Sequence, residues 1–187
     1  MKILLTLIAA ALVAAPAGAM TYTIDPAHTS VGFTIKHLGV SKVHGRFNAV
    51  SGTVDYVAGK PASWKTAVEI DPASVDTHIG ARDKHLKSPD FFDVEKCPKM
   101  SFKSTKAEAS KLYGDLTMHC VTKPVVLDLE ISEGKDPKGN PILGGTASGT
   151  ISRKDWAVGS AGPMLGDEVK LELDVEAHPA VKDSGKQ

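Results

Sequence analysis

The adjacent pair His119-Cys120 stands at the end of the alternating segment GDLTMHCVTKPV. A histidine next to a cysteine could bind a metal, form half of a nucleophilic dyad, or supply one sulfur of a disulfide bond. If the two residues continue the strand before them, their side chains point to opposite faces, which is a poor arrangement for a dyad. We therefore expect His119 to be a polar residue near the rim of the fold.

The seven histidines show no spacing typical of a metal site. His37 and His44 lie seven residues apart, as do His78 and His85, and there is no HxxxH, HExxH or CxxC motif. The sequence thus predicts neither a metal site nor a catalytic residue. An enzyme that uses His37, His44 or His119 is an alternative hypothesis, which loss of pH-dependent turnover in His→Ala variants would test.

Two further segments resemble chemical motifs only in part. VGSAG, around Ser160, lacks the first glycine of the GxSxG nucleophile motif. ARDKHLKSPDFFDVEK mixes acidic and basic side chains without a pair of carboxylates placed for general acid–base catalysis. Ion pairs on a solvated helix explain that mixture equally well. The apolar pair Phe91-Phe92 within it is suited to covering one mouth of a barrel.

The first 19 residues have the layout of a secretory signal peptide. Lys2 precedes an apolar run from Ile3 to Val13, and Ala17 and Ala19 follow in A-x-A spacing. The run is shorter than the roughly 20 residues that a membrane span needs. We predict cleavage after Ala19 and export. Without Lys2, one of 22 Lys and Arg, the chain carries 21 basic and 22 acidic residues, so it has no bulk attraction to nucleic acids.

The two cysteines are expected to form a disulfide bond, because an exported chain meets an oxidising compartment. Suppose that residues 100–106 and 111–119 form a hairpin whose turn is centred between Glu108 and Ala109. Residue numbers of cross-strand partners then add to about 217, and Cys97 faces Cys120. Two free, buried thiols are the alternative.

Alternation of apolar and polar residues dominates the rest of the chain. In VKLELDVEA, the apolar side chains from Val169 to Ala177 alternate with charged ones. This period of two is typical of a strand with one buried and one solvated face. Related patterns predict further strands at residues 22–25, 31–37, 43–57, 64–70, 100–106, 112–118, 125–131 and 143–152.

About eight antiparallel strands favour a closed arrangement, because open sheet edges promote aggregation. Glycines inside the predicted strands, including Gly45, Gly52 and Gly145, indicate bulges or tight bends that curve a sheet into a barrel. The predicted fold is therefore all-β, an eight-stranded antiparallel barrel. A barrel of this size can hold one small ligand.

The barrel is expected to form one domain over residues 20–178. A short helical insertion is predicted around residues 79–93, divided by Ser88-Pro89. The polar residues 179–187 are predicted to be a flexible tail.

The sequence resembles the YceI-like family over nearly all of Tyr22 to Ala177, in four segments of matching order and spacing: YTIDPAHTSVGFTIKHLGVSKVHGRFNAVSGTV, SVDTHIGARDKHLKSPDFFDVEKCPKMSFKST, GDLTMHCVTKPVVLDLE and SGTISRKDW. The resemblance implies a lipocalin-like barrel in the bacterial periplasm that binds a long apolar molecule, such as a polyisoprenoid, an isoprenoid quinone, a fatty acid or an amide. It implies no catalytic residue and no cofactor other than the bound lipid or quinone.

The resemblance also implies a set of ligand-binding residues, which face inward and are apolar: Phe33, Ile35, Phe47, Leu116, Met118, Leu127, Leu129 and Trp156, with Phe91 and Phe92 near the mouth. Two positions depart from the family pattern. The family usually has an aromatic residue where Cys97 stands and glycine where Cys120 stands, and the joint change to cysteine agrees with a disulfide bond.

A long-chain apolar lipid is therefore the predicted partner of a periplasmic carrier protein. A homodimer and a membrane protein that handles lipids or electrons are further hypotheses for its partners. The second function hypothesis is a redox or stress accessory protein that uses a bound quinone or the Cys97–Cys120 pair.

Overall fold

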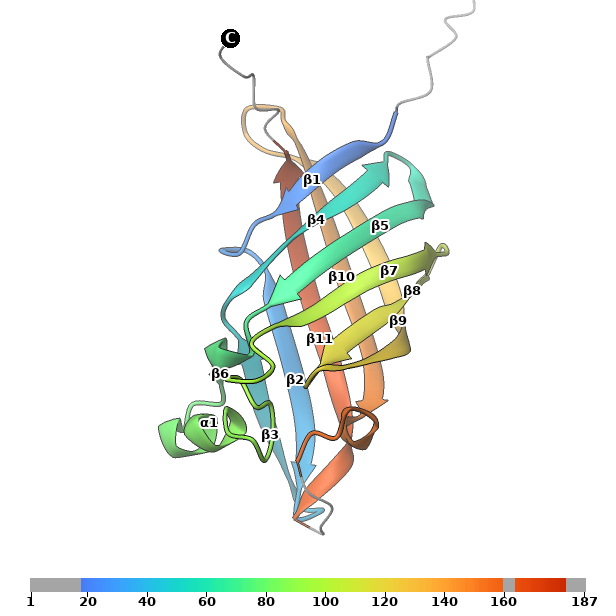
Figure 1. Cartoon of the computed structure of the whole chain (residues 1–187). Coiled ribbons are helices and arrows are strands. Elements are labelled where there is room, and N and C mark those ends of the chain that lie inside the picture. The colour runs from blue at the N-terminus through green and yellow to red at the C-terminus, as the bar shows by residue number, and fades with distance from the viewer. Residues whose placement is uncertain (1–17, 160–163, 181–187) are drawn as a thin grey trace, which may run out of the picture.

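The computed structural model describes residues 18–159 and 164–180, in which one long antiparallel sheet closes on itself (Figure 1). The elements are β1 Met20–Ile24, β2 Ser30–His37, β3 Ser41–Phe47, β4 Val50–Val57, β5 Lys60–Ile70, η1 Pro72–Ser74, β6 Val75–Asp76, α1 Gly80–Leu86, β7 Met100–Ala107, β8 Lys111–Met118, β9 Val121–Lys135, β10 Pro141–Ser152, η2 Arg153–Trp156 and β11 Leu165–Pro179.

Eight of the strands form a closed ring. Their order is β1-β4-β5-β7-β8-β9-β10-β11, and β1 pairs again with β11. β2, β3 and β6 extend the sheet from β11 beyond this ring, towards the end of the molecule where α1 lies (Figure 1). The predicted all-β, eight-stranded antiparallel barrel is confirmed.

The strand β11 shares one edge between two partners. Its Leu165–Asp174 part pairs with β2, and its last residues, Ala177 to Pro179, pair with β1. Hydrogen bonding to β11 continues through the corner between β1 and β2, because Asp25 N donates to Glu176 O at 2.8 Å. This corner is the seam at which the barrel closes.

The prediction of one strand over residues 43–57 is wrong. β3 pairs with β2, whereas β4 pairs with β1 and β5, so the chain changes partners between them. At the break, Asn48 N donates to Ser74 O and Ala49 N donates to Ser74 Oγ. At this break, these bonds to η1 take the place of hydrogen bonds between strands.

The helical insertion is shorter than predicted. α1 ends at Leu86, and residues 87–96 form turns. Because a residue before proline disfavours the helical region, Ser88-Pro89 ends the helix rather than dividing it into two pieces. Phe91 and Phe92 therefore lie on a turn, where Phe92 N donates to Leu86 O at 3.0 Å.

Parts of the predicted ends lie outside the described residues. These are residues 1–17 of the predicted signal peptide, Ser160 of VGSAG, and residues 181–187 of the predicted tail. Pro179 is the last residue of β11, and Ala180 N donates to Thr21 O, so the first two residues of the predicted tail pair with β1. Within the described part of the chain, no helix has the length and apolar character needed to cross a bilayer.

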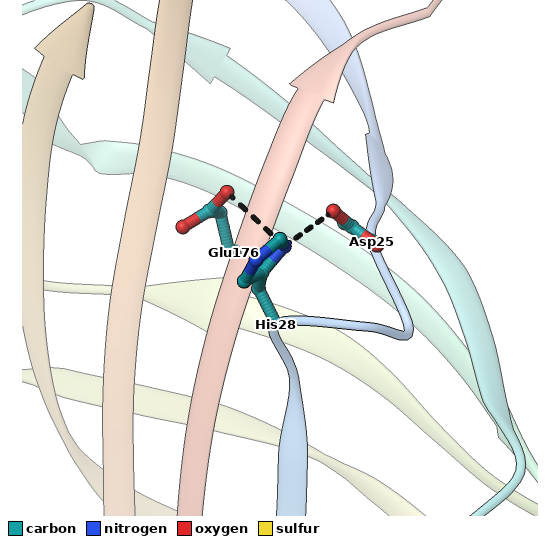
Figure 2. A group of neighbouring side chains, drawn as sticks. All are labelled: Asp25, His28 and Glu176. Carbon is teal, nitrogen blue, oxygen red and sulfur yellow. Dashed lines mark hydrogen bonds and ion pairs between the residues drawn. The ribbon is translucent and has the colours of Figure 1, made fainter. Parts of the chain in front are cut away.

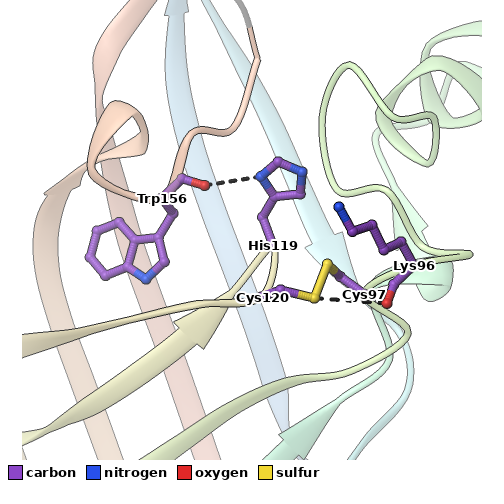
Figure 3. The surroundings of a disulfide bond; sticks show 5 residues. All are labelled: Lys96, Cys97, His119, Cys120 and Trp156. Carbon is purple, nitrogen blue, oxygen red and sulfur yellow. Dashed lines mark hydrogen bonds between the residues drawn. A yellow bond between two sulfur atoms is a disulfide. The ribbon is translucent and has the colours of Figure 1, made fainter.

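The disulfide bond Cys97–Cys120 is confirmed, with a Cα–Cα distance of 5.4 Å (Figure 3). The predicted register was one residue off: Phe102 faces Leu116 and Ser101 faces Thr117. The bridge forms nevertheless, because Cys97 lies in the loop before β7 and can adjust. It ties the segment after α1 to the β8–β9 hairpin.

His119 and Cys120 are not in a strand, contrary to the prediction. They are the two central residues of the turn between β8 and β9, and their φ angles are 49° and 59°. Positive φ at both positions is the pattern of a type I′ turn, which normally favours glycine, asparagine or aspartate. The turn thus keeps a conformation suited to glycine although Cys120 occupies it.

The turn and the bridge make separable contributions to stability. Replacing both cysteines by alanine should lower the free energy of unfolding by about 3 kcal/mol, because the denatured chain loses a cross-link over a separation of 23 residues. Cys97→Ala with Cys120→Gly should be about 1 kcal/mol more stable than the double alanine variant, since glycine tolerates positive φ. Denaturant unfolding measures both, and equal stability of the two double variants would contradict the account of the turn.

Candidate functional site

A cavity of about 780 Å³ lies inside the barrel. Its walls come from inward-facing residues of β1–β5 and β7–β11 and from the segment around α1, and most of these residues are apolar. Nine of the ten predicted ligand-binding residues line it: Phe33, Ile35, Phe47, Phe91, Phe92, Leu116, Met118, Leu127 and Leu129. Their contact with a ligand remains a prediction.

Trp156, the tenth predicted residue, is not part of the cavity lining. It is buried in η2, where its indole Nε1 donates to Leu116 O at 3.0 Å. Its own carbonyl oxygen accepts a hydrogen bond from His119 Nδ1 at 3.0 Å (Figure 3). Leu116 lies in β8 and His119 in the turn after it, so Trp156 attaches η2 to that hairpin instead of lining the cavity. The same bond gives His119 a structural role.

Three aromatic rings lie against glycines inside the barrel. A Cβ atom on Gly45 would come within 2.3 Å of the Phe33 ring, and one on Gly145 within 2.8 Å of the Trp64 ring. Gly114 accommodates Phe102 in the same way. Phe33 and Phe102 each lie over a glycine of the neighbouring strand and so stay close to the wall, whereas Trp64 reaches from β5 to Gly145 on β10.

This use of glycine differs from the prediction of bulges. The register shifts of the sheet fall at residues 55–57, 104–106 and 165–169, and none falls at Gly45, Gly52 or Gly145. At Gly52 the reason is the approach of two strands, because a Cβ atom there would be 2.3 Å from Ala67 O.

The end of the barrel near the β1–β11 seam is filled. Tyr22, Tyr56, Leu143 and Ala177 are buried there and do not line the cavity. Tyr56 Oη donates to Glu133 Oε1 at 2.8 Å. Burial, followed by this hydrogen bond, raises the pKa of Tyr56 to about 12. The Tyr56 phenol is thus neutral at physiological pH.

The opposite end of the cavity is open and more polar. The exposed members of the lining are His85, Asp90 and Met164, all near α1 or the start of β11. His85 Nε2 lies 3.3 Å from Asp90 Oδ2. Arg82, also in the lining, donates from Nε to Thr77 Oγ1 at 2.7 Å. This end, which we call the mouth, combines charged groups with an apolar entrance.

Phe91 and Phe92 lie at the mouth, as predicted. The Phe91 ring packs edge-on against His85, with centroids 4.9 Å apart. The Phe92 ring packs edge-on against Phe47 at 5.5 Å, and Phe47 in turn contacts Phe33 at 5.7 Å. An aromatic row thus leads from the mouth into the interior.

Arg153, at the start of η2, is buried and lines the cavity. Its guanidinium donates to the carbonyl oxygens of Val158 at 2.7 Å and Gly166 at 2.9 Å, and it lies 3.4 Å from Asp167. A buried cation needs such partners, because desolvation without them is costly. The network holds η2 against the start of β11.

Several residues of the cavity were not predicted from the sequence, and most of them lie at the mouth. They include His37, Trp64, Thr77, Arg82, His85, Asp90, Phe102, Ala147 and Met164. Trp64 and Phe102 follow the alternating pattern of β5 and β7, so the period of two could have found them. Arg82 and His85 at the mouth lie in the short helix α1, and Asp90 lies in a turn, so a period of two does not identify them.

Residues 22–177 match the model of a family described as the YceI-like domain. The UPF0312 protein plu2095 of Photorhabdus laumondii is 45% identical over 164 residues, which cover 83% of this chain and 85% of that protein. The YCEI protein of Campylobacter jejuni has a similar structure, with 36% identity, a TM-score of 0.71, and coverage of 83% and 96%. A polyisoprenoid binding domain from Saccharophagus degradans shares the fold at 12% identity, with a TM-score of 0.65 and coverage of 86% and 99%.

The close contact between Gly45 and the Phe33 ring predicts how a substitution at Gly45 would change the cavity. Gly45→Ala should displace the Phe33 ring into the interior and weaken the binding of a long-chain fluorescent lipid by about tenfold. Gly134→Ala is the matched control, because no atom lies within 4 Å of its added Cβ. Fluorescence titration compares the two variants, and equal affinities would show that the ring position does not control the cavity.

Proposed function

The chain belongs to the YceI-like family, and on this premise we propose that it carries one long apolar lipid inside its barrel. An isoprenoid-type molecule, such as a polyprenyl chain or an isoprenoid quinone, is the ligand we favour. The family match and the shared fold with a polyisoprenoid binding domain support the choice of an isoprenoid. The main structural support for the proposal is the apolar cavity of about 780 Å³.

The size and lining of the cavity agree with this ligand class. Small-molecule sites span roughly 300–1,000 Å³ and bury most of their ligand. Each methylene transferred from water to such an interior contributes about 0.8 kcal/mol, so a long hydrocarbon chain can bind with few polar contacts. The apolar walls therefore suit a lipid tail better than a polar substrate.

The two unlike ends of the cavity suggest how the lipid is oriented. The seam end is closed by buried side chains, whereas the mouth carries Arg82, His85 and Asp90. A hydrocarbon tail would lie towards the seam, and the polar head group would remain at the mouth. In this proposal the lipid or quinone is cargo, so the protein needs neither a catalytic residue nor a further cofactor.

The proposed location is the bacterial periplasm. The layout of the first 19 residues and the Cys97–Cys120 bond both suit export to an oxidising compartment. A redox or stress role, through a bound quinone or the cysteine pair, stays a separate prediction. The reduction potential of the disulfide would test the part of it that concerns the cysteines.

The lipid should copurify with the protein and depend on free space inside the barrel. Ala147 lines the cavity on β10, and its neighbour Ser148 faces solvent. Ala147→Phe should reduce the lipid recovered in organic extracts by about tenfold, because the new ring occupies the ligand's volume. Ser148→Phe adds the same ring outside and should leave the lipid content unchanged.

Mass spectrometry of the extracts measures this difference. Recovery of a stoichiometric apolar compound from the parent protein and from Ser148→Phe, but not from Ala147→Phe, is the expected result. No apolar compound in any of the three preparations would contradict the proposed function.

The mouth should contact the membrane from which the lipid is taken. Leu38 and Val40, at the tip of the β2–β3 hairpin, are 54% and 88% exposed, and Met164 is 62% exposed. Leu38 N donates to Met164 O at 2.8 Å, so these apolar side chains belong to one surface. Val40→Asp should slow lipid transfer from vesicles by about tenfold without changing equilibrium affinity.

Val126→Asp provides the control for this experiment. Val126 is 50% exposed on β9, outside the hairpin tip. Transfer rates from labelled vesicles are compared by stopped-flow fluorescence. An equal loss in both variants would mean that exposed apolar area in general, and not the mouth, sets the rate.

A further inference from the structure

Two histidines and two carboxylates meet on the outside of the barrel at the β1–β11 seam. Asp25 and His28 belong to the corner between β1 and β2, and Glu176 and His178 belong to β11. Figure 2 shows His28 placed between Asp25 and Glu176. Glu176 and His178 share the outer face of β11, because the residue between them, Ala177, is fully buried. The cluster is far from the mouth and is not part of the cavity lining.

The backbone fixes the positions of these side chains. Asp25 Oδ1 accepts a hydrogen bond from Ala27 N at 2.9 Å, which turns Oδ2 towards the histidines. Asp25 N donates to Glu176 O, and Glu176 N donates to Thr29 Oγ1 at 3.2 Å. The corner and β11 are therefore held together before any ion binds, and such support is what orients ligands in metal sites.

The ligand atoms of Asp25, His28 and Glu176 all lie within 4.8 Å of one another, and His178 approaches both carboxylates. His28 Nδ1 lies 2.8 Å from Asp25 Oδ2 and 3.8 Å from Glu176 Oε1. His178 Nε2 lies 3.5 Å from the same Asp25 oxygen and 3.1 Å from the same Glu176 oxygen. Ligands about 2.1 Å from a tetrahedral zinc ion are about 3.4 Å apart, so small side-chain rotations would suffice.

The charges of the cluster also favour a cation. The ligand atoms of Asp25 and Glu176 lie within 4.8 Å of one another, a spacing at which two carboxylates repel. A divalent ion between the two carboxylates would remove their repulsion.

We propose that Asp25, His28, Glu176 and His178 form a binding site for a divalent transition-metal ion of the zinc type. Two imidazole nitrogens and two carboxylate oxygens suit zinc or a neighbouring first-row ion, whereas calcium and magnesium prefer oxygen ligands alone. The bound ion joins the β1–β2 corner to β11 and so clamps the seam. This site departs from the expectation, drawn from sequence spacing, that the histidines bind no metal.

Zinc titration of the full protein tests the site. Tag-free protein is stripped with a chelator, exchanged into chelator-free buffer and titrated with zinc chloride by isothermal calorimetry. We expect one zinc ion per chain and a rise in Tm of about 5 °C at a hundredfold excess over Kd. His28→Ala and His178→Ala should each weaken binding at least about tenfold, and calcium should bind at least about tenfold more weakly than zinc.

His78→Ala is the matched control, because His78 is also exposed but lies near a single carboxylate, 3.8 Å from Asp76. Its zinc affinity should equal that of the parent protein. Circular dichroism and Tm in the presence of chelator verify that the variants fold. The proposal is overturned if one-to-one binding is absent at about 0.1 mM zinc, or if His28→Ala and His178→Ala bind as tightly as His78→Ala. The lipid content is measured separately, since the cavity does not include this cluster.

Discussion

The closure of the sheet at β11 is the constraint on which the rest of the structure depends. One edge of this 15-residue strand pairs with β10, and the other is divided between β1 and β2. The short pairing with β1 completes the ring of eight strands, so the barrel has no open edge there. The longer pairing with β2 extends the wall beyond the ring and forms the region around the mouth. A closed end and an open end both follow from this division.

Closure alone would give a filled barrel, because eight strands leave an interior that side chains can occupy. The cavity exists because large residues are placed unevenly along it. Tyr22, Tyr56 and Leu143 fill the seam end, while farther along the rings of Phe33 and Phe102 lie against Gly45 and Gly114 of neighbouring strands. The sheet therefore provides an apolar space with a closed bottom, which is the property that the proposed lipid carrier needs.

The sequence predicts the parts of this structure that depend on local periodicity. Alternation in β9 and β11 identifies both the strands and their inward faces, because burial of one face imposes a period of two. The break between β3 and β4 could not be found in this way, since it reflects a change of pairing partner. The pairing of Cys97 with Cys120 was predicted despite a register error of one residue, because Cys97 lies in a loop outside the paired strands.

Features that depend on distant residues were not predictable from spacing. Asp25 and Glu176 are brought together only by barrel closure, and the packing of Trp64 over Gly145 joins β5 to β10 across the interior. The positive φ of His119 and Cys120 had only an indirect signal, the glycine that the family usually has at position 120, because neither histidine nor cysteine requires that conformation. In each case the tertiary structure imposes the arrangement, and local preference does not.

Native mass spectrometry of the protein purified from its own cells tests the central claim most directly. The account predicts that the folded chain carries a mass excess equal to one apolar lipid. Organic solvent should extract this compound, and the remaining polypeptide should have its calculated mass. A folded protein with the mass of the polypeptide alone, or with only polar adducts, would contradict the claim that the barrel holds a lipid.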